Sequence, residues 1–357
     1  MDKVILVGGG TGGHCIPMVS LYKKFSKLNV SCLIITDKRG SVFFNELNQN
    51  DVIVLKTPTK TVSMFQQLLN FPIIYLQVLT TLLWSKDSHV LGFGGFITLP
   101  VLFCANNVKI NTSIHEANAI IGKANRILAK NASNIFLTFD KTKMLDATLH
   151  NKAHNVGLPL REEVVNLVKI KNITNRSRYV ISVIGGSQGS YSLSNEVPMA
   201  LIKFSKKINN SLFIYHQCRK EDVIRIRRKY RAFGVLCEVS NYFYNMPNII
   251  SKSNLIISRS GSSTLNEIIY TSKPSILIPF PFAVDDHQHH NANILKKISC
   301  AKLINNADLT SNLLLKNLLR IFKDPDKIIY ISQKLRKITH KNTSLRMLKI
   351  IQNSNAN

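Results

Sequence analysis

Hydrophobic and polar positions divide the chain into two alternating kinds of segment. Short apolar runs alternate with longer stretches of helical periodicity, which is typical of parallel βαβ units with buried strands. The runs predicted to be strands are residues 4–7, 31–36, 52–55, 90–91, 111–114 and 135–138 in the first half and 179–184, 212–216, 235–239, 255–258 and 275–279 in the second. Residues 309–351 carry helical periodicity and no strand signal. The pattern predicts an α/β protein that ends in helices.

Two glycine-rich segments each follow an apolar run and precede a helical pattern. They are GGGTGGH at residues 8–14 and GGSQGS at 185–190. Glycine allows a sharp turn and a close approach to a ligand, and the first N–H groups of the following helix attract an anion. The 357 residues are enough for two domains. The repeat therefore predicts two nucleotide-binding-type α/β domains that face each other across a cleft.

Composition narrows the class of protein. A hydrophobic fraction of 45% with charges of both signs describes a globular chain. The six cysteines are scattered without a C-x-x-C pair, which argues against a zinc site or a disulfide framework and fits a reducing cytoplasm. The first predicted strand begins so early that we expect no signal peptide before it.

The formal net charge of +27 is unusual. Such a surface attracts polyanions, either nucleic acid or an anionic membrane, although a lysine-rich solvated surface explains it equally well. Basic clusters at residues 219–231 and 334–349 lack the aromatic pattern of an RNA-binding module. We therefore expect no nucleic-acid partner.

Residues 64–84 form the most apolar window. The window is long enough to span a membrane, but polar residues and a proline interrupt it: Gln66, Gln67, Asn70, Pro72 and Gln77. We do not predict a transmembrane helix. The favoured interpretation is a helix packed on the sheet, and the alternative is a surface helix whose apolar face dips into lipid.

Two further segments of the first half follow predicted strands, a glycine cluster and a polar segment. The glycine cluster at residues 92–96 is typical of a tight strand-to-helix turn. A helix from Asn118 would place Asn118, Gly122 and Asn125 on one face. Glu116 lies at a strand's carboxyl end, where open α/β sheets bind ligands, and either a site role or a capping role fits it.

The segment 257–291 is the strongest candidate site in the second half. After a strand end and Gly261 come three hydroxyl residues and then Glu267, a pattern that suits a diphosphate at a helix start and a ribose diol one turn further on. The alternative is a capping box formed by Thr264 and Glu267. The loop at 279–292 adds two aspartates, a glutamine and three histidines; His287, His289 and His290 lack the order of a metal-binding motif.

Together these motifs resemble the MurG family of cell-wall glycosyltransferases. They span nearly the whole chain in the family's order: GGGTGGH at 8–14, GFGGF at 92–96, HEANAIIGKAN at 115–125, GGSQGS at 185–190, RSGSSTLNE at 259–267 and DDHQHHNA at 285–292. The resemblance implies a GT-B fold with two Rossmann-like parallel-sheet domains. Residues 1–161 would bind the acceptor and associate with the membrane, 162–338 would bind the UDP-sugar donor, and 339–357 would form a helix crossing back to the first domain.

The resemblance also implies roles for individual residues. Thr11, Gly12 and Gly13 would lie near the sugar diphosphate, Asn118 would contact the donor sugar, and Arg161 and Ser187 would contact the diphosphate. Phe243 would meet the uracil through its backbone, Ser262, Ser263, Thr264 and Leu265 would hold phosphates, Glu267 the ribose hydroxyls, and Gln288 the hydroxyls of N-acetylglucosamine (GlcNAc). The chain departs from the family at Leu158 (usually Asn), Ala117 (usually Gln) and Ser262 (usually Ala), and Leu158 removes a polar group beside Arg161.

The reaction implied is an inverting transfer of GlcNAc from UDP-GlcNAc to the muramyl C4 hydroxyl of undecaprenyl-diphosphate-linked muramyl-pentapeptide, a step of peptidoglycan synthesis. His14 is the predicted general base, and its alternative is a structural hydrogen bond within the loop. Helix N-termini and Arg161 would neutralise the departing diphosphate, so we expect neither a metal nor another cofactor. The implied location is peripheral, at an anionic membrane surface on the cytoplasmic face of the bacterial inner membrane.

Three other functions fit parts of the sequence. An NAD-dependent oxidoreductase would use Gly8, Gly10 and Gly13 with Asp37 as the ribose-binding acid. A UDP-sugar epimerase shares the fold implied but does not explain the apolar window. A non-enzymatic nucleic-acid-binding protein is supported only by charge.

Overall fold

The computed structural model describes residues 3–56, 64–167, 178–186, 189–208 and 211–356. Within that part, the chain divides into two compact units. Unit 1 comprises Met1–Arg161 with His340–Asn357, and unit 2 comprises Glu162–Thr339.

Unit 1 is built on a seven-stranded sheet in which all described pairings are parallel. The strand order is β3-β2-β1-β4-β5-β6-β7. Its strands are β1 (Lys3–Val7), β2 (Ser31–Asp37), β3 (Val52–Leu55), β4 (Ser88–Gly92), β5 (Thr112–Glu116), β6 (Asn134–Leu137) and β7 (Ala153–Asn155). Its helices are α1 (Gly12–Ser26), α2 (Met64–Leu83), α3 (Thr98–Asn107), α4 (Lys123–Leu128) and α13 (Thr343–Ala356).

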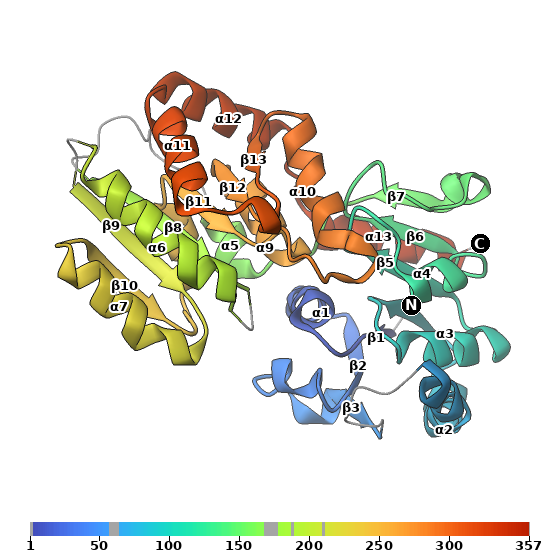
Figure 1. Cartoon of the computed structure of the whole chain (residues 1–357). Helices are drawn as coiled ribbons and strands as arrows, with labels where there is room; N and C mark the ends of the chain where they lie inside the picture. The colour runs from blue at the N-terminus through green and yellow to red at the C-terminus, as the bar shows by residue number, and fades with distance from the viewer. Residues whose placement is uncertain (1–2, 57–63, 168–177, 187–188, 209–210, 357) are drawn as a thin grey trace. The chain divides into compact units, whose positions relative to one another are not determined.

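Apolar clusters cover both faces of this sheet. One joins strand residues to α2 and α3, and the other joins them to α1 and to Met347, Leu348 and Ile351 of α13. Figure 1 shows α13, in red, beside the green strand β6 of unit 1. Asn134 of β6 donates a hydrogen bond of 2.9 Å to Ser354. The last helix of the chain therefore packs on the first sheet.

Unit 2 contains a six-stranded sheet, again with parallel pairings, in the order β10-β9-β8-β11-β12-β13. Its strands are β8 (Arg178–Ile184), β9 (Ser211–Gln217), β10 (Leu236–Ser240), β11 (Leu255–Ser258), β12 (Ser275–Leu277) and β13 (Ala301–Leu303). Its helices are α5 (Glu162–Asn166), α6 (Tyr191–Ser205), α7 (Val223–Ala232), α8 (Met246–Lys252), α9 (Ser262–Tyr270), α10 (His287–Lys297), α11 (Ser311–Phe322) and α12 (Pro325–Lys337).

Every strand predicted from the apolar runs is present. Among the strands of the described residues, β7 and β13 were not predicted; each is three residues long and lies at a sheet edge. The predicted helix at residues 64–84 is α2, and residues 309–351 fold into α11, α12 and α13 as expected. Among the described residues, no helix combines the length and the apolar character needed to cross a bilayer.

Each sheet reverses its winding direction at one place. In unit 1 the chain runs from β1 outward to β3 and then restarts at β4 on the other side of β1. In unit 2 it runs from β8 outward to β10 and restarts at β11 on the other side of β8. Open α/β sheets bind ligands at the carboxyl ends of the strands that flank such a switch point. The turns after β1 and β4, and after β8 and β11, are therefore the places to look for function.

Candidate functional site

His14 lies at the switch point of unit 1, in the first turn of α1. Its Nδ1 atom is 3.0 Å from the carbonyl oxygen of Gly9. A carbonyl oxygen only accepts, so Nδ1 donates, and the neutral imidazole then carries its lone pair on Nε2. A Cβ atom added to Gly94, whose φ is +97°, would lie 3.2 Å from Nε2. Glycine at position 94 thus lets the turn after β4 approach the proton-accepting side of the ring.

The structural hydrogen bond and the role of base are therefore compatible for His14. The bond to Gly9 shapes the loop, and it also selects the tautomer that a general base needs. Thr11 is exposed and is the residue that precedes α1, with no side-chain capping bond. Gly12 and Gly13 form the first turn of this helix.

Asp37, at the end of β2, holds the first glycine loop. Its Oδ1 atom accepts hydrogen bonds from the backbone N–H groups of Gly10 (2.9 Å) and Gly40 (2.7 Å). The side chain is buried. A ribose-binding acid must present its oxygens to the ligand, whereas this carboxylate binds the loop itself. This contact weighs against the oxidoreductase alternative.

Glu116 organises the turn that follows β5. Its carboxylate accepts from the backbone and side-chain nitrogens of Asn118 at 2.9 and 3.2 Å, from the backbone of Gly122 at 2.9 Å, and from the side chain of Asn125 at 2.9 Å. A helix from Asn118, the condition under which these residues would share a face, does not form, because α4 begins at Lys123. The three residues still come together, around one buried carboxylate instead of along a helix face. Glu116 therefore acts as a structural acceptor for the loop.

His115, beside Glu116, is fully buried. Its Nε2 atom lies 3.1 Å from the carbonyl oxygen of Gly157, and its ring packs against Phe93 with centroids 5.3 Å apart. Burial lowers the pKa of His115 to about 4, so the ring is neutral at pH 7.

The two candidate helix starts of unit 2 lie at its switch point. Ser190 precedes α6, and its hydroxyl accepts from the backbone N–H of Leu193 at 3.4 Å. Gly189 has φ +71°, and a Cβ there would come within 2.5 Å of the backbone nitrogen of Arg219, so the glycine permits this close approach. Ser187 lies outside the described residues.

Helix α9 begins at Ser262, and Gly261 precedes it without a side-chain cap. The capping-box alternative for Thr264 and Glu267 is therefore wrong, since Thr264 lies inside the first turn instead of at the cap. Ser262, Leu265 and Glu267 are buried and Thr264 is half-buried. The buried hydroxyl of Ser263 has no hydrogen-bond partner among the described residues. An uncapped helix start with hydroxyl groups is the arrangement that receives phosphate.

Gln288 lies in the first turn of α10. Its Oε1 atom accepts from the backbone N–H groups of Ser260 (3.2 Å) and Phe280 (3.0 Å), which leaves the amide NH₂ as the end that can donate to a ligand. Asp285 and Asp286 before it both have φ +50°, a left-handed backbone that non-glycine residues adopt at a cost of about 1–2 kcal/mol each. Within the described ranges, no group of three or more metal-ligating side chains occurs.

Phe243 borders a cavity of about 350 Å³ in unit 2. The lining includes Tyr215 of β9 and Asn248 and Lys252 of α8. The Phe243 side chain is buried and meets the Tyr215 ring edge-on, with centroids 6.0 Å apart. Arg161, in contrast, is half-buried at the end of unit 1. The structure thus places the predicted residues in two groups, one in each unit.

Comparison with known proteins identifies the family. Residues 4–137 match the glycosyltransferase family 28 N-terminal domain, and residues 180–347 match the glycosyltransferase family 28 C-terminal domain. Two relatives are named UDP-N-acetylglucosamine–N-acetylmuramyl-(pentapeptide) pyrophosphoryl-undecaprenol N-acetylglucosamine transferase. The protein of Rickettsia bellii is 32% identical over 347 residues (94% of this chain, 95% of that one), and the protein of Paramagnetospirillum magneticum is 30% identical over 332 residues (91% and 90%). The chain belongs to the MurG family of glycosyltransferases.

Solved structures show the same fold. The crystal structure of Acinetobacter baumannii MurG aligns with a TM-score of 0.78 at 23% identity, covering 98% of this chain and 99% of that one. A UDP-GlcNAc 2-epimerase from Neisseria meningitidis aligns with a TM-score of 0.71 at 15% identity, covering 98% and 100%. The predicted family and the predicted GT-B fold are both confirmed. The epimerase shares the fold, while the relatives at 30% identity or more carry the transferase name.

The three departures from the family pattern are all buried. Leu158, Ala117 and Ser262 are each at most 5% exposed. Leu158 and Ala117 bring apolar side chains to these buried positions. Ser262 receives hydrogen bonds from Asn266 at its carbonyl (2.9 Å) and its hydroxyl (3.4 Å), so its hydroxyl is held within α9.

Proposed function

We propose that this chain transfers GlcNAc from UDP-GlcNAc to the muramyl C4 hydroxyl of undecaprenyl-diphosphate-linked muramyl-pentapeptide, with inversion at the sugar. The observation that carries the proposal is 30–32% identity with transferases of that name over at least nine tenths of both chains. The two switch points supply chemistry that fits the reaction.

Unit 2 is the proposed donor-binding unit. The uncapped start of α9 receives the diphosphate, with Ser262, Ser263, Thr264 and Leu265 around it. Glu267 accepts from the ribose hydroxyls, Gln288 donates its NH₂ to the GlcNAc hydroxyls, and Phe243 meets the uracil through its backbone. Thr11, Gly12, Gly13, Asn118, Arg161 and Ser187 stay predictions that rest on the family resemblance.

His14 is the proposed general base of unit 1. Its Nε2 takes the proton of the acceptor hydroxyl while that oxygen forms a bond to C1 of GlcNAc. The bond from C1 to the diphosphate oxygen breaks at the same time, and UDP leaves with the negative charge. The hydrogen bond from Nδ1 to Gly9 supports this role because it fixes the acceptor nitrogen on the other side of the ring.

The outer face of α2 is the proposed membrane-contacting surface. Its exposed apolar side chains include Ile73 (51%) and Leu76 (65%), and Trp84, just beyond its end, is 91% exposed. Phe103 of α3 adds a ring at 44% exposure, 5.7 Å from that of Phe71. Leu79, in contrast, packs against the core of unit 1. One face of α2 is therefore core and the other is available to lipid, as an interfacial helix requires.

The acceptor proposed here carries a lipid that stays in the bilayer, so the enzyme must work at a membrane surface. We place it peripherally on the cytoplasmic face of the inner membrane, where the net charge of +27 favours anionic lipid.

The direct test is transfer of labelled GlcNAc from UDP-GlcNAc to a synthetic muramyl-peptide diphospholipid. We expect a lipid-linked disaccharide and release of UDP. Incubation with UDP-GlcNAc alone is the control for the epimerase alternative. Epimerised UDP-sugar in that control, with no labelled lipid in the full reaction, would overturn the proposal.

A further inference from the structure

Arg259 is a buried cation at the switch point of unit 2. It follows β11 directly, and its backbone N–H donates to Ile184, the last residue of β8, at 3.2 Å. The residue is 8% exposed. It therefore lies between the two strand ends at which the sheet reverses its winding.

The guanidinium of Arg259 donates to neutral oxygens of two segments, residues 278–279 and residues 190–192. Nη1 donates to the carbonyl oxygens of Ile278 (3.0 Å) and Pro279 (2.8 Å), and Nη2 donates to the hydroxyls of Ser190 (2.7 Å) and Ser192 (2.9 Å). Its charged end also lies over the ring of Phe280, at 5.7 Å from the centroid. Arg259 thus ties the turn after β12 to the start of α6.

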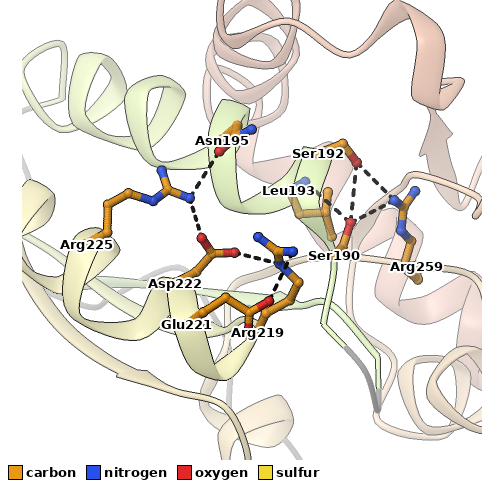
Figure 2. Close-up of polar contacts among 9 residues, drawn as sticks. All are labelled: Ser190, Ser192, Leu193, Asn195, Arg219, Glu221, Asp222, Arg225 and Arg259. Carbon is orange, nitrogen blue, oxygen red and sulfur yellow. Dashed lines mark hydrogen bonds and ion pairs between the residues drawn. The ribbon is translucent and has the colours of Figure 1, made fainter.

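Figure 2 contrasts Arg259 with two other arginines beside α6. Arg219 and Arg225 both pair with the carboxylate of Asp222, at 2.9 and 2.7 Å. Among the described residues, no carboxylate pairs with Arg259. Burial without a counter-ion lowers the pKa of Arg259 to about 10, which still leaves it charged at pH 7. A buried charge that only neutral dipoles solvate is costly unless an anion offsets it.

The contacts of Arg259 lead to both ends of the proposed donor site. Ser190 is the capping residue that precedes α6, and the uncapped α9 starts three residues after Arg259. On the other side, Arg259 holds the carbonyls of Ile278 and Pro279, and the next N–H, that of Phe280, holds Gln288. The Arg259 side chain therefore links the start of α6 to the turn that holds Gln288, the residue proposed for the sugar, and Arg259 lies three residues before the helix start proposed for phosphate.

We infer that Arg259 is a positioning residue for the donor diphosphate. The negative charge of the diphosphate offsets the buried guanidinium, and Arg259 holds the segments around the diphosphate in place through Ser190, Ser192 and the turn before Gln288. This inference rests on the proposed function. Under this inference, a buried positive charge of unit 2 itself stabilises the negative charge of the leaving diphosphate.

The test compares UDP with uridine, which shares the base and ribose and lacks the diphosphate. In Arg259→Gln, we expect UDP affinity to fall at least about tenfold, because the charge is lost, while uridine affinity changes less than about twofold. Calorimetry measures the first and ligand-observed NMR the second. A purely structural role would lower both affinities equally, and that result, or no change in either, would overturn the inference.

Two further variants complete the experiment. Arg225→Gln is the matched control, an arginine that contacts Asn195 of α6 at 3.0 Å and already has a carboxylate partner, and we expect its UDP affinity to stay within about twofold of the wild type. If Arg259→Gln does not fold, Arg259→Lys decides, since it keeps the charge: UDP affinity within about threefold supports the inference, and equal loss of UDP and uridine overturns it. A wild-type protein that binds no UDP would instead reject the proposed function.

Discussion

The two switch points share one topology and differ in chemistry. In unit 1, the carboxylates of Asp37 and Glu116 accept from backbone and amide N–H groups, and the candidate reactive group is the imidazole of His14, whose Nδ1 is held by Gly9. In unit 2, the switch point contains the buried guanidinium of Arg259 and an uncapped helix start. The first arrangement can accept a proton and the second can accept an anion. The same fold thus serves two tasks because the side chains of the turns, and not the sheets, decide the chemistry.

The largest expected effect would come from removing the proton acceptor of unit 1. In His14→Gln, we expect turnover to fall by roughly 10²–10⁴-fold, the usual contribution of a general base, while UDP affinity is unchanged. Steady-state transfer and calorimetry measure the two quantities. The exposed His150, in the same unit, provides the control variant His150→Gln. Near-normal turnover of His14→Gln at saturating substrate would show that His14 is not the base and that its role is the structural hydrogen bond to Gly9.

A second variant tests donor binding by unit 2. Glu267→Ala should lose two hydrogen bonds from the ribose to a charged acceptor, each worth roughly 1.5–3 kcal/mol, so UDP affinity should fall well over tenfold. Far-ultraviolet circular dichroism checks the fold, and Glu163→Ala, an exposed carboxylate of α5, is the control. Unchanged UDP affinity in a folded Glu267→Ala would remove Glu267 from the site.

Acid should weaken both units by the same mechanism. The pKa of buried His115 in unit 1 is lowered to about 4 and that of buried His216 in unit 2 to about 3, both by burial. Above pH 6.5 the ring is neutral in the folded and the unfolded chain. As pH falls from about 6.5 towards about 4, these histidines bind protons in the unfolded chain but stay neutral in the folded chain. The free energy of unfolding therefore falls by roughly 3 kcal/mol for each of the two histidines.

Urea unfolding at pH 7, 6, 5 and 4 measures this loss. In His216→Gln, the decline for unit 2 should become shallower, while that for unit 1 should persist. A variant with the same pH slope as the wild type in unit 2 would show that other groups carry the acid sensitivity.

The smallest expected effect concerns the surface of unit 1. The wild type should sediment with anionic vesicles, release partly at high salt and bind neutral vesicles weakly. Leu76→Ser combined with Trp84→Ser should reduce the salt-resistant fraction, because the apolar contribution does not depend on salt, and should leave UDP affinity unchanged. Ile224→Ser, at a residue of α7 that is 62% exposed, is the control in unit 2. Failure of the wild type to bind anionic vesicles at low salt would contradict the membrane proposal.

The amino-acid sequence by itself determined the sheets and the family. A central parallel strand is buried on both faces, so its apolar run is visible without any knowledge of its neighbours, and glycine loops after such runs mark the turns. The edge strands β7 and β13 contain no buried residue, so no apolar run marks them, whereas β12 is equally short but fully buried. These two segments become strands because they pair with the neighbouring strands β6 and β12.

Tertiary structure alone decided the contacts of the sites. Residues 118–122 are not helical, because the buried carboxylate of Glu116 accepts from the N–H of Gly122, which a helix starting at Asn118 would direct to the carbonyl of Asn118. Arg259 contacts Ser190 across 69 positions of the chain, and no local pattern encodes such a distance. Local sequence sets which residues can form a strand or a turn, whereas burial and long-range hydrogen bonding decide which polar groups are occupied and which are left for a ligand.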